Sequence, residues 1–291
     1  MSRATLFNDK IIAISDLIRL KKQYGTLLLL APTMWSLFLA SNGVPSVKLL
    51  VIFIFGTFLM RSAGCAINDI ADRKFDRFVE RTKLRPLASG RIGLRGAIFV
   101  FSMFSLLAFV LVLFLNPFTI MLSFAAIFLA SLYPFVKRVS YLPQVFLGMA
   151  FGWGSVMAWS AVRNEIGIPA VTIFFANIFW STAYDTIYAL MDKDDDLKIG
   201  VKSTAILFGK QVYNITALFF LSVLILLFSL GFMLSLGIAY FMSILIAAVI
   251  FFYQIIIIRR RPDRETAFRA FVLNAVVGLI ILFGIFADML I

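Results

Sequence analysis

Long stretches without a charged residue occupy most of the chain. An α-helix of about 20 apolar residues crosses the hydrocarbon core of a bilayer, so a stretch of that length predicts one membrane span. Four stretches have this length: residues 23–47, 139–162, 166–184 and 270–287. Two longer stretches, 96–136 and 211–258, predict helical hairpins that break at Asn116-Pro117 and near Gly231.

One further span covers residues 48–70 and contains Arg61. Only 14% of the residues are charged and 62% are hydrophobic, with a mean hydropathy of +0.99. A soluble domain usually carries about 25% charged residues. The sequence therefore predicts an all-α, polytopic membrane protein with nine membrane-spanning helices, at residues 24–42, 47–70, 96–115, 117–135, 143–162, 168–190, 211–230, 234–258 and 269–288.

The basic residues are concentrated in alternate loops. Of the 27 Lys and Arg residues, 24 fall in the N-terminal segment and the loops 71–95, 136–141, 191–210 and 259–269. The opposite loops contain only Lys48 and Arg163. Because cytoplasmic loops carry an excess of Lys and Arg, we expect the N-terminus in the cytoplasm and the C-terminus outside.

The chain divides into an N-terminal segment, residues 1–22, and a single membrane-embedded domain, residues 23–291. Apolar side chains recur at helical spacing in the first segment, at Leu6, Phe7, Ile11, Ile14, Leu17 and Ile18. This spacing favours an amphipathic helix on the cytoplasmic surface of the membrane. The alternative is a disordered basic tail.

Eight of the 15 acidic residues fall in two short clusters. The first, NDIADRKFD, contains Asn68, Asp69, Asp72 and Asp76, and the second, DTIYALMDKDDD, contains Asp185, Tyr188, Asp192, Asp194, Asp195 and Asp196. At about 100° per residue, the oxygens of each cluster follow one face of a helix. Both clusters lie at the cytoplasmic end of an even-numbered span. The D-x3-D core repeats four helices later, which predicts two four-helix halves that face each other, with a ninth helix added.

Like charges on one helical face repel each other, and a divalent cation relieves that repulsion. The chain has no His and a single Cys, Cys65, which excludes His-ligated haem, Cys-based zinc sites and Ser-His catalytic pairs. Ligands that are all oxygen select Mg²⁺ or Mn²⁺, and substrate phosphates commonly complete the Mg²⁺ shell. Basic residues that would attract a phosphate flank both clusters: Arg73, Lys83, Arg85, Arg91, Lys198 and Lys202. The pattern predicts a Mg²⁺–diphosphate site at the cytoplasmic face.

At these residues the chain resembles the membrane-embedded aromatic prenyltransferases, and most closely the branch that acts on 4-hydroxybenzoate in ubiquinone biosynthesis. The family motif NDxxDxxxD is matched by Asn68, Asp69, Asp72 and Asp76, and the motif DxxYAxxDxxxD by Asp185, Tyr188, Ala189, Asp192 and Asp196. The segments RPLASG, YPFVKR and IGVKSTAILFG are also similar to that branch. The resemblance covers nearly the whole chain.

The resemblance implies that Mg²⁺, bridging the two motifs, binds a polyprenyl diphosphate. It further implies that the allylic C–O bond ionises and that the carbocation alkylates 4-hydroxybenzoate at the carbon ortho to its hydroxyl. The metal ligands would be Asn68, Asp69, Asp72, Asp76, Asp185, Asp192 and Asp196, and the catalytic carboxylates Asp72, Asp76, Asp185, Asp192 and Asp196.

Several side chains have two possible roles. Arg138 is our candidate partner for the carboxylate of the aromatic acid, because a guanidinium pairs with a carboxylate through two hydrogen bonds; alternatively it is a topological anchor, and Lys137 competes for either role. Asp192 either orients or deprotonates the phenol or only binds metal. Tyr188 either hydrogen-bonds the diphosphate or packs as an aromatic ring. Arg61, an intramembrane charge, is expected to partner the diphosphate or to be structural.

Other functions are less consistent with the pattern. A cation transporter would place its carboxylates near the middle of the bilayer, whereas both clusters lie at one interface. A CDP-alcohol phosphotransferase would require a DG-x2-AR string, which the sequence lacks. Within the resembling family, homogentisate, dihydroxynaphthoate, haem or a glycerol phosphate remain alternative acceptors.

Overall fold

The computed structural model describes residues 3–290, and residues 3–8 by their backbone alone. Within this range the chain is helical and contains no strand. The helices are α1 (Arg3–Leu17), α2 (Tyr24–Ser41), α3 (Val47–Asp72), α4 (Leu94–Val112), α5 (Pro117–Val136), α6 (Pro143–Arg163), α7 (Ile168–Ala189), α8 (Lys193–Ile199), α9 (Thr204–Leu207), α10 (Val212–Met233), α11 (Ile238–Arg260) and α12 (Arg264–Asp288), with short 3₁₀ turns η1 (Asp76–Phe78) and η2 (Gly209–Gln211).

All nine predicted spans are helices within residues 3–290. Eight of them have both the length and the hydropathy of a membrane span: α2 to α6 and α10 to α12. The ninth, α7, is 22 residues long but carries polar side chains such as Asn177, Thr182 and Asp185, which lower its hydropathy. It packs between α6 and α10, and Asn177 and Thr182 are buried. The fold is therefore the predicted all-α membrane bundle.

The structure corrects two of the predicted helix ends. α10 continues to Met233, and the break before α11 lies at residues 234–237 rather than at Gly231. A Cβ atom on Gly231 would lie 2.8 Å from the ring of Tyr240, so this glycine allows α10 and α11 to approach closely. α12 begins at Arg264 rather than at 269 because the Asp263 side chain accepts a hydrogen bond from the Thr266 amide, 2.8 Å away.

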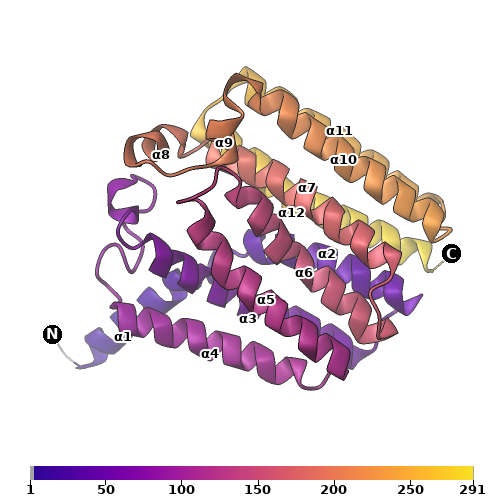
Figure 1. Cartoon of the computed structure of the whole chain (residues 1–291), viewed down its shortest axis with the longest axis horizontal. Helices are drawn as coiled ribbons and strands as arrows, with labels where there is room; N and C mark the ends of the chain where they lie inside the picture. The colour runs from indigo at the N-terminus through magenta and orange to yellow at the C-terminus, as the bar shows by residue number, and fades with distance from the viewer. Residues whose placement is uncertain (1–2, 291) are drawn as a thin grey trace.

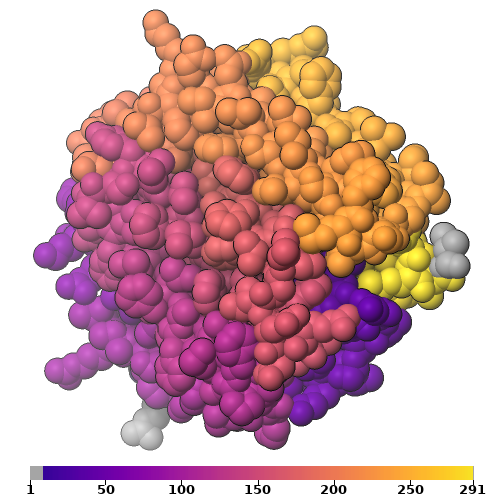
Figure 2. Space-filling view, turned by 45° about the vertical axis from the view of Figure 1, so that its right-hand side comes forward, coloured from indigo at the N-terminus to yellow at the C-terminus, as the bar shows by residue number. Residues whose placement is uncertain are grey.

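The helices run side by side, with α1, α8 and α9 at one end of the bundle and the C-terminus at the other (Figure 1). The second and third spans of each half are in close contact, α3 with α4 and α7 with α10. α12 packs against α2, α7 and α11, and Figure 2 shows the yellow C-terminal helix beside indigo atoms of α2. The arrangement agrees with two four-helix halves closed by a ninth helix.

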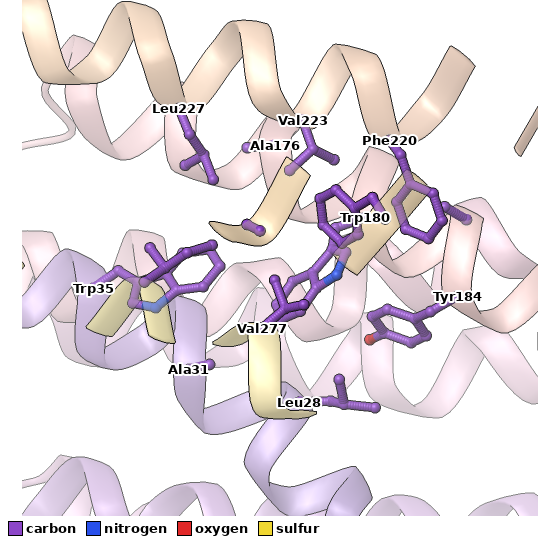
Figure 3. Packing of buried hydrophobic residues seen from close by; sticks show 14 of the residues in the cluster. Leu28, Ala31, Trp35, Ala176, Trp180, Tyr184, Phe220, Val223, Leu227 and Val277 are labelled. Carbon is purple, nitrogen blue, oxygen red and sulfur yellow. The ribbon is translucent and has the colours of Figure 1, made fainter. Parts of the chain in front are cut away.

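Two tryptophans at the centre of the core connect α2, α7 and α12 (Figure 3). The rings of Trp35 and Trp180 stack with centroids 5.3 Å apart. Trp35 donates a hydrogen bond to the carbonyl oxygen of Gly278 (2.9 Å), and Trp180 donates to the side-chain oxygen of Asn274 (2.8 Å). Because both buried indole N–H groups are satisfied, the aromatic core fixes the position of α7, whose far end carries the second acidic cluster.

The N-terminal segment is helical, as its apolar spacing predicts. Leu17 and Ile18 are buried in a cluster with Ala66 of α3 and Ala97 of α4, whereas Ile11 is 49% exposed. One apolar side of α1 thus packs on the protein and another faces outward. The predicted contribution of Leu6 and Phe7 lies outside the described side chains. Placement on the membrane surface stays a prediction.

Candidate active site

Both acidic clusters line a single cavity of about 650 Å³ at the end of the bundle that carries α8 and α9. From the two clusters it is lined by Asn68, Asp72, Asp76, Asp185, Asp192 and Asp196, and its aromatic hydroxyls are those of Tyr24, Tyr133, Tyr184 and Tyr188. Basic residues line the same space, among them Arg19, Arg61, Arg81, Arg85, Lys137 and Lys202. The structure therefore brings together residues that lie more than 100 positions apart in the sequence.

The first cluster is held by basic side chains. Lys137 Nζ lies 2.5 Å from Asp72 Oδ2, and Arg85 Nη1 lies 2.9 Å from Asp76 Oδ2. Burial raises the pKa of Asp76, and Arg85 opposes that rise. Burial would also lower the pKa of Arg85, but Asp69, Asp76 and Asp72 together raise it above its ordinary value. Arg85 is therefore a fixed cation at the first motif.

Asp69 is the one predicted metal ligand that does not line the cavity. Its carboxylate is fully buried, with Oδ1 2.6 Å from Arg19 Nη2 and 3.5 Å from Arg85 Nη1. About 100° of helical rotation separates it from Asn68, which turns Asp69 toward α1 instead. In this geometry Asp69 anchors the turn that follows α1 to α3.

The second cluster contains fewer ion pairs. Arg81 binds Asp192, with Nε 3.0 Å from Oδ1 and 3.1 Å from Oδ2, and Nη2 also donates to Oδ2. Within residues 3–290, the carboxylates of Asp185 and Asp196 have no ion pair or side-chain hydrogen bond. Burial, reinforced by the charge of Asp192 and only partly offset by Lys137, raises the pKa of Asp196 to about 7.

The donors in this cavity fit a hard divalent cation. Asp72 Oδ1 is buried without a hydrogen-bond partner, and Asp185 and Asp196 face the cavity from the opposite motif. In the described part of the chain, no three carboxylates are already gathered around one point. Mg²⁺ is usually held by one or two carboxylates together with phosphate and water oxygens, so this donor set is suited to an ion that arrives with a phosphorylated substrate.

Of the six flanking cations predicted to attract a phosphate, three line the cavity, Arg85, Arg91 and Lys202, and three do not, Arg73, Lys83 and Lys198. Lys202 lines the cavity, but its ammonium donates to the carbonyl oxygen of Val139 at 3.2 Å. Lys83 pairs with Glu80 at 2.7 Å and Arg73 is exposed, and neither lines the cavity. Arg85 thus remains as the predicted cation closest to the carboxylates.

The structure places Lys137, and not Arg138, in the cavity. The Arg138 guanidinium donates to the carbonyl oxygen of Ala71, and it lies 3.9 Å from Asp72 Oδ1 and 4.8 Å from the ring centroid of Phe75. Because α5 ends at Val136, the next two side chains leave the helix in different directions, and only the first turns inward. Of the two competitors named from the sequence, the geometry favours Lys137 as a cavity residue.

Arg61 extends from α3 into the deep end of the cavity. Its guanidinium donates to the sulfur of Cys65, and within the described residues it has no carboxylate partner. A Cβ atom on Gly25 would lie 2.6 Å from Arg61 Nη2, so the glycine provides the space that the guanidinium occupies. A cation without a paired anion, open to a substrate cavity, is suited to bind an anionic group.

Sequence reasoning missed several residues of the site, among them Arg19, Arg81 and Tyr133. Arg19 and Arg81 are two of many basic residues in cytoplasmic segments, and no local pattern distinguishes them. Tyr133 precedes Lys137 by four positions, which is one helical turn on the same face. That spacing is a signal from which Tyr133 could have been identified.

A second, apolar cavity of about 120 Å³ adjoins the first. The two share Arg61, Tyr133 and Phe151 as lining residues. Its walls come from α2 to α6, and a Cβ atom added to Gly56 or Gly64 would meet nothing within 4 Å. We call it the apolar groove; it extends the polar cavity toward the membrane interior.

Comparison with known proteins agrees with this arrangement. The chain matches the UbiA prenyltransferase family over residues 29–285. It is 54% identical to the 4-hydroxybenzoate octaprenyltransferase of Tolumonas auensis, over 93% of this chain and 94% of that one, and 49% identical to the enzyme of the same name from Yersinia enterocolitica, over 98% of each.

Solved structures share the fold. A UbiA homologue from Aeropyrum pernix superposes with a TM-score of 0.81 at 26% identity, covering 91% of this chain and 98% of that one. A homologue from Archaeoglobus fulgidus bound to GPP and Mg²⁺ superposes with a TM-score of 0.73 at 18% identity, covering 96% and 100%. The family match over most of the chain and the relatives at about half identity are decisive: the chain belongs to the UbiA prenyltransferase family.

Proposed function

We propose that this protein transfers a polyprenyl group from a polyprenyl diphosphate to the ring carbon ortho to the hydroxyl of 4-hydroxybenzoate, giving 3-polyprenyl-4-hydroxybenzoate for ubiquinone biosynthesis. The observation that carries the proposal is the joining of an oxygen- and cation-lined cavity to an apolar groove. The names of relatives such as the Tolumonas auensis enzyme support this acceptor. We place the cavity at the cytoplasmic face of a bacterial inner membrane, because the basic loops surround it.

The polar cavity would bind the diphosphate. Asp72, Asp76, Asp192 and Asp196 would hold Mg²⁺, with the oxygens of Asn68 and Asp185 within the same cavity. When bound, Mg²⁺ neutralises the charge that develops on the departing diphosphate. Lys137 and Arg85, fixed beside the first motif, would add to that stabilisation as the allylic C–O bond breaks.

The apolar groove would take the first part of the isoprenoid chain. Its lining is almost entirely aliphatic, aromatic or glycine, and it meets the polar cavity at Tyr133 and Phe151. The reactive carbon of the donor would therefore lie where the groove joins the cavity. There the ring carbon of the acceptor would form the new C–C bond as the C–O bond to the diphosphate breaks, and the ring proton would pass to the departing diphosphate or a cavity carboxylate, which restores aromaticity.

For the acceptor carboxylate we now favour Arg61 over Arg138. Arg61 lines both cavities and has no carboxylate partner among the described residues, whereas Arg138 is engaged by the Ala71 carbonyl outside the cavity. The phenol would then point back toward the second motif. Asp192 or Asp185 would orient or deprotonate it, and an ionised oxygen would make the ring more nucleophilic.

The acceptor test uses purified protein, Mg²⁺ and a mixture of polyprenyl diphosphates. We expect mass spectrometry to detect prenylated 4-hydroxybenzoate and no product from homogentisate, dihydroxynaphthoate or haem. A dominant product from another acceptor would overturn the proposed substrate and leave the prenyl transfer in place.

A second test separates the two arginines. Arg61→Met should raise the KM for 4-hydroxybenzoate about 10- to 150-fold, the usual effect of a lost charge-assisted hydrogen bond, and should change the KM for the prenyl diphosphate much less. Arg138→Met serves as the matched control and should leave the KM for the acid unchanged. A 4-hydroxybenzoate ester should discriminate weakly between wild type and Arg61→Met. The reverse pattern would return the role to Arg138.

A further inference from the structure

One side chain connects the loop of the first motif to the second motif. Arg81 belongs to the segment between α3 and α4, and its guanidinium contacts both carboxylate oxygens of Asp192. Its Nη1 also donates to the hydroxyl of Tyr188 at 2.7 Å, and its Cζ lies 4.9 Å from the centroid of that ring. Every hydrogen bond that this guanidinium makes among residues 3–290 therefore ends on the second motif.

These contacts occupy a carboxylate that the metal site also needs. A guanidinium that spans both oxygens leaves few lone pairs of Asp192 for a cation. Lys137 on Asp72 differs, because it contacts Oδ2 and leaves Oδ1 without a hydrogen-bond partner, with Arg138 Nη2 3.9 Å from that oxygen. Asp72 can accept a metal with its ammonium partner in place, whereas Asp192 cannot do so without losing part of its pairing with Arg81.

We propose that Arg81 is an exchangeable counter-ion, which competes with Mg²⁺ for Asp192 and transfers to the diphosphate oxygens when the Mg²⁺–diphosphate binds. This inference rests on the proposed function. A guanidinium fork fits a phosphate as well as it fits a carboxylate, so the arginine exchanges one anion for another within the same cavity. The Tyr188 ring holds the guanidinium over the cavity during the exchange through its cation–π contact.

The exchange predicts two effects of opposite sign. Without Arg81, nothing competes with a metal ion for Asp192, so the metal alone should bind more tightly. The diphosphate should bind more weakly, because it loses one of its cations. A purely structural arginine, which only tied the loop to α8, would weaken both kinds of binding together.

The test measures metal binding by the purified protein without turnover. Mn²⁺, read by the loss of the free-ion EPR signal, replaces Mg²⁺ as the probe. Arg81→Gln should bind Mn²⁺ about 10-fold more tightly than wild type in the absence of diphosphate, and should bind a non-hydrolysable prenyl diphosphate analogue about 10- to 150-fold more weakly in its presence. Arg81→Lys, a point charge without a fork, should lie between the two.

Arg77→Gln is the matched control. Arg77 lies in the same segment but is exposed and does not line the cavity, and its guanidinium packs 5.9 Å from the ring centroid of Phe78. This variant should resemble wild type in both titrations. Equal or weaker Mn²⁺ binding by Arg81→Gln would overturn the exchange. Failure of wild type to prenylate 4-hydroxybenzoate would instead overturn the proposed function, and the two results are read from separate experiments.

Discussion

The two acidic clusters share a D-x3-D core and line one cavity, yet basic residues balance them differently. In the first cluster all three carboxylates have a cationic partner: Asp69 pairs with Arg19, Asp72 with Lys137 and Asp76 with Arg85. Among the cavity carboxylates of the second cluster, only Asp192 has an ion-pair partner within the described residues, Arg81.

This difference suggests that the first cluster contributes mainly to the stability of the fold and the second mainly to metal binding. A buried carboxylate with a partner is part of the folded structure, and its loss leaves a buried cation unpaired. A half-buried carboxylate without a partner destabilises the fold but is available to a metal ion, and the raised pKa of Asp196 is a sign of that cost. We infer that the first cluster chiefly organises the site, whereas the second chiefly adjusts its affinity for metal.

Removing the metal should have the largest effect, because both clusters then fail together. Excess EDTA should abolish prenyl transfer. Mn²⁺ should restore part of the activity and Ca²⁺ little, since Ca²⁺ favours a looser and higher coordination. Product formation measured with each ion in turn checks this expectation. Full activity in EDTA would contradict a metal site at either cluster.

Asp196→Ala tests the second cluster alone. Activity at fixed Mg²⁺ should fall by at least about 10- to 100-fold, the loss typical even of groups outside the immediate ligand shell, while the melting temperature in detergent stays the same or rises.

The double variant Asp72→Ala with Asp192→Ala tests whether the two clusters act together. Its loss of activity should be smaller than the product of the two single losses, because the two residues act as one unit. Multiplicative losses would mean that the two clusters work independently.

Asp69→Ala tests the stabilising role of the first cluster. It leaves Arg19 without its partner and should reduce the free energy of unfolding by about 3–5 kcal/mol, as for other broken buried pairs. The remaining folded protein should retain most of its affinity for the prenyl diphosphate. Measuring thermal unfolding and diphosphate binding on the same variant distinguishes a stabilising residue from a metal ligand. Loss of binding without loss of stability would make Asp69 a ligand.

The smallest expected effect is a pH dependence of metal binding. Asp196, with a pKa of about 7, is protonated at lower pH and must lose that proton to ligate a metal. Lowering the pH from 8 to 6 should therefore weaken the apparent Mg²⁺ affinity about 10-fold. Asp196→Asn should remove most of this slope, and an unchanged slope would assign it to another group.

Much of the architecture could be predicted because it is encoded locally. Span lengths, the start of α5 at Asn116-Pro117 and the shared face of Asn68, Asp72 and Asp76 all depend on neighbours within a few residues. Their meeting in one cavity could be inferred from the repeat of the D-x3-D core.

The pairing of charges could not be predicted, because it depends on how the segment between α3 and α4 folds. Eight basic residues fall within 71–95, and nothing in their order shows that Arg81 crosses to Asp192 while Lys83 pairs with Glu80. Whether Lys137 or Arg138 enters the cavity likewise depends on the residue at which α5 ends. One residue of helix changes which side chain turns inward.

The size of the apolar groove has a consequence for the product. At about 120 Å³ it has room for only a small part of a long polyprenyl chain, and the remainder must lie among the acyl chains of the bilayer. Under the proposed function, the protein therefore recognises the diphosphate end of its donor and does not contact the far end of the isoprenoid chain. The number of isoprene units in the final quinone would then be decided upstream, by whichever synthase builds the diphosphate, and the same protein moved into another cell would make that cell's quinone.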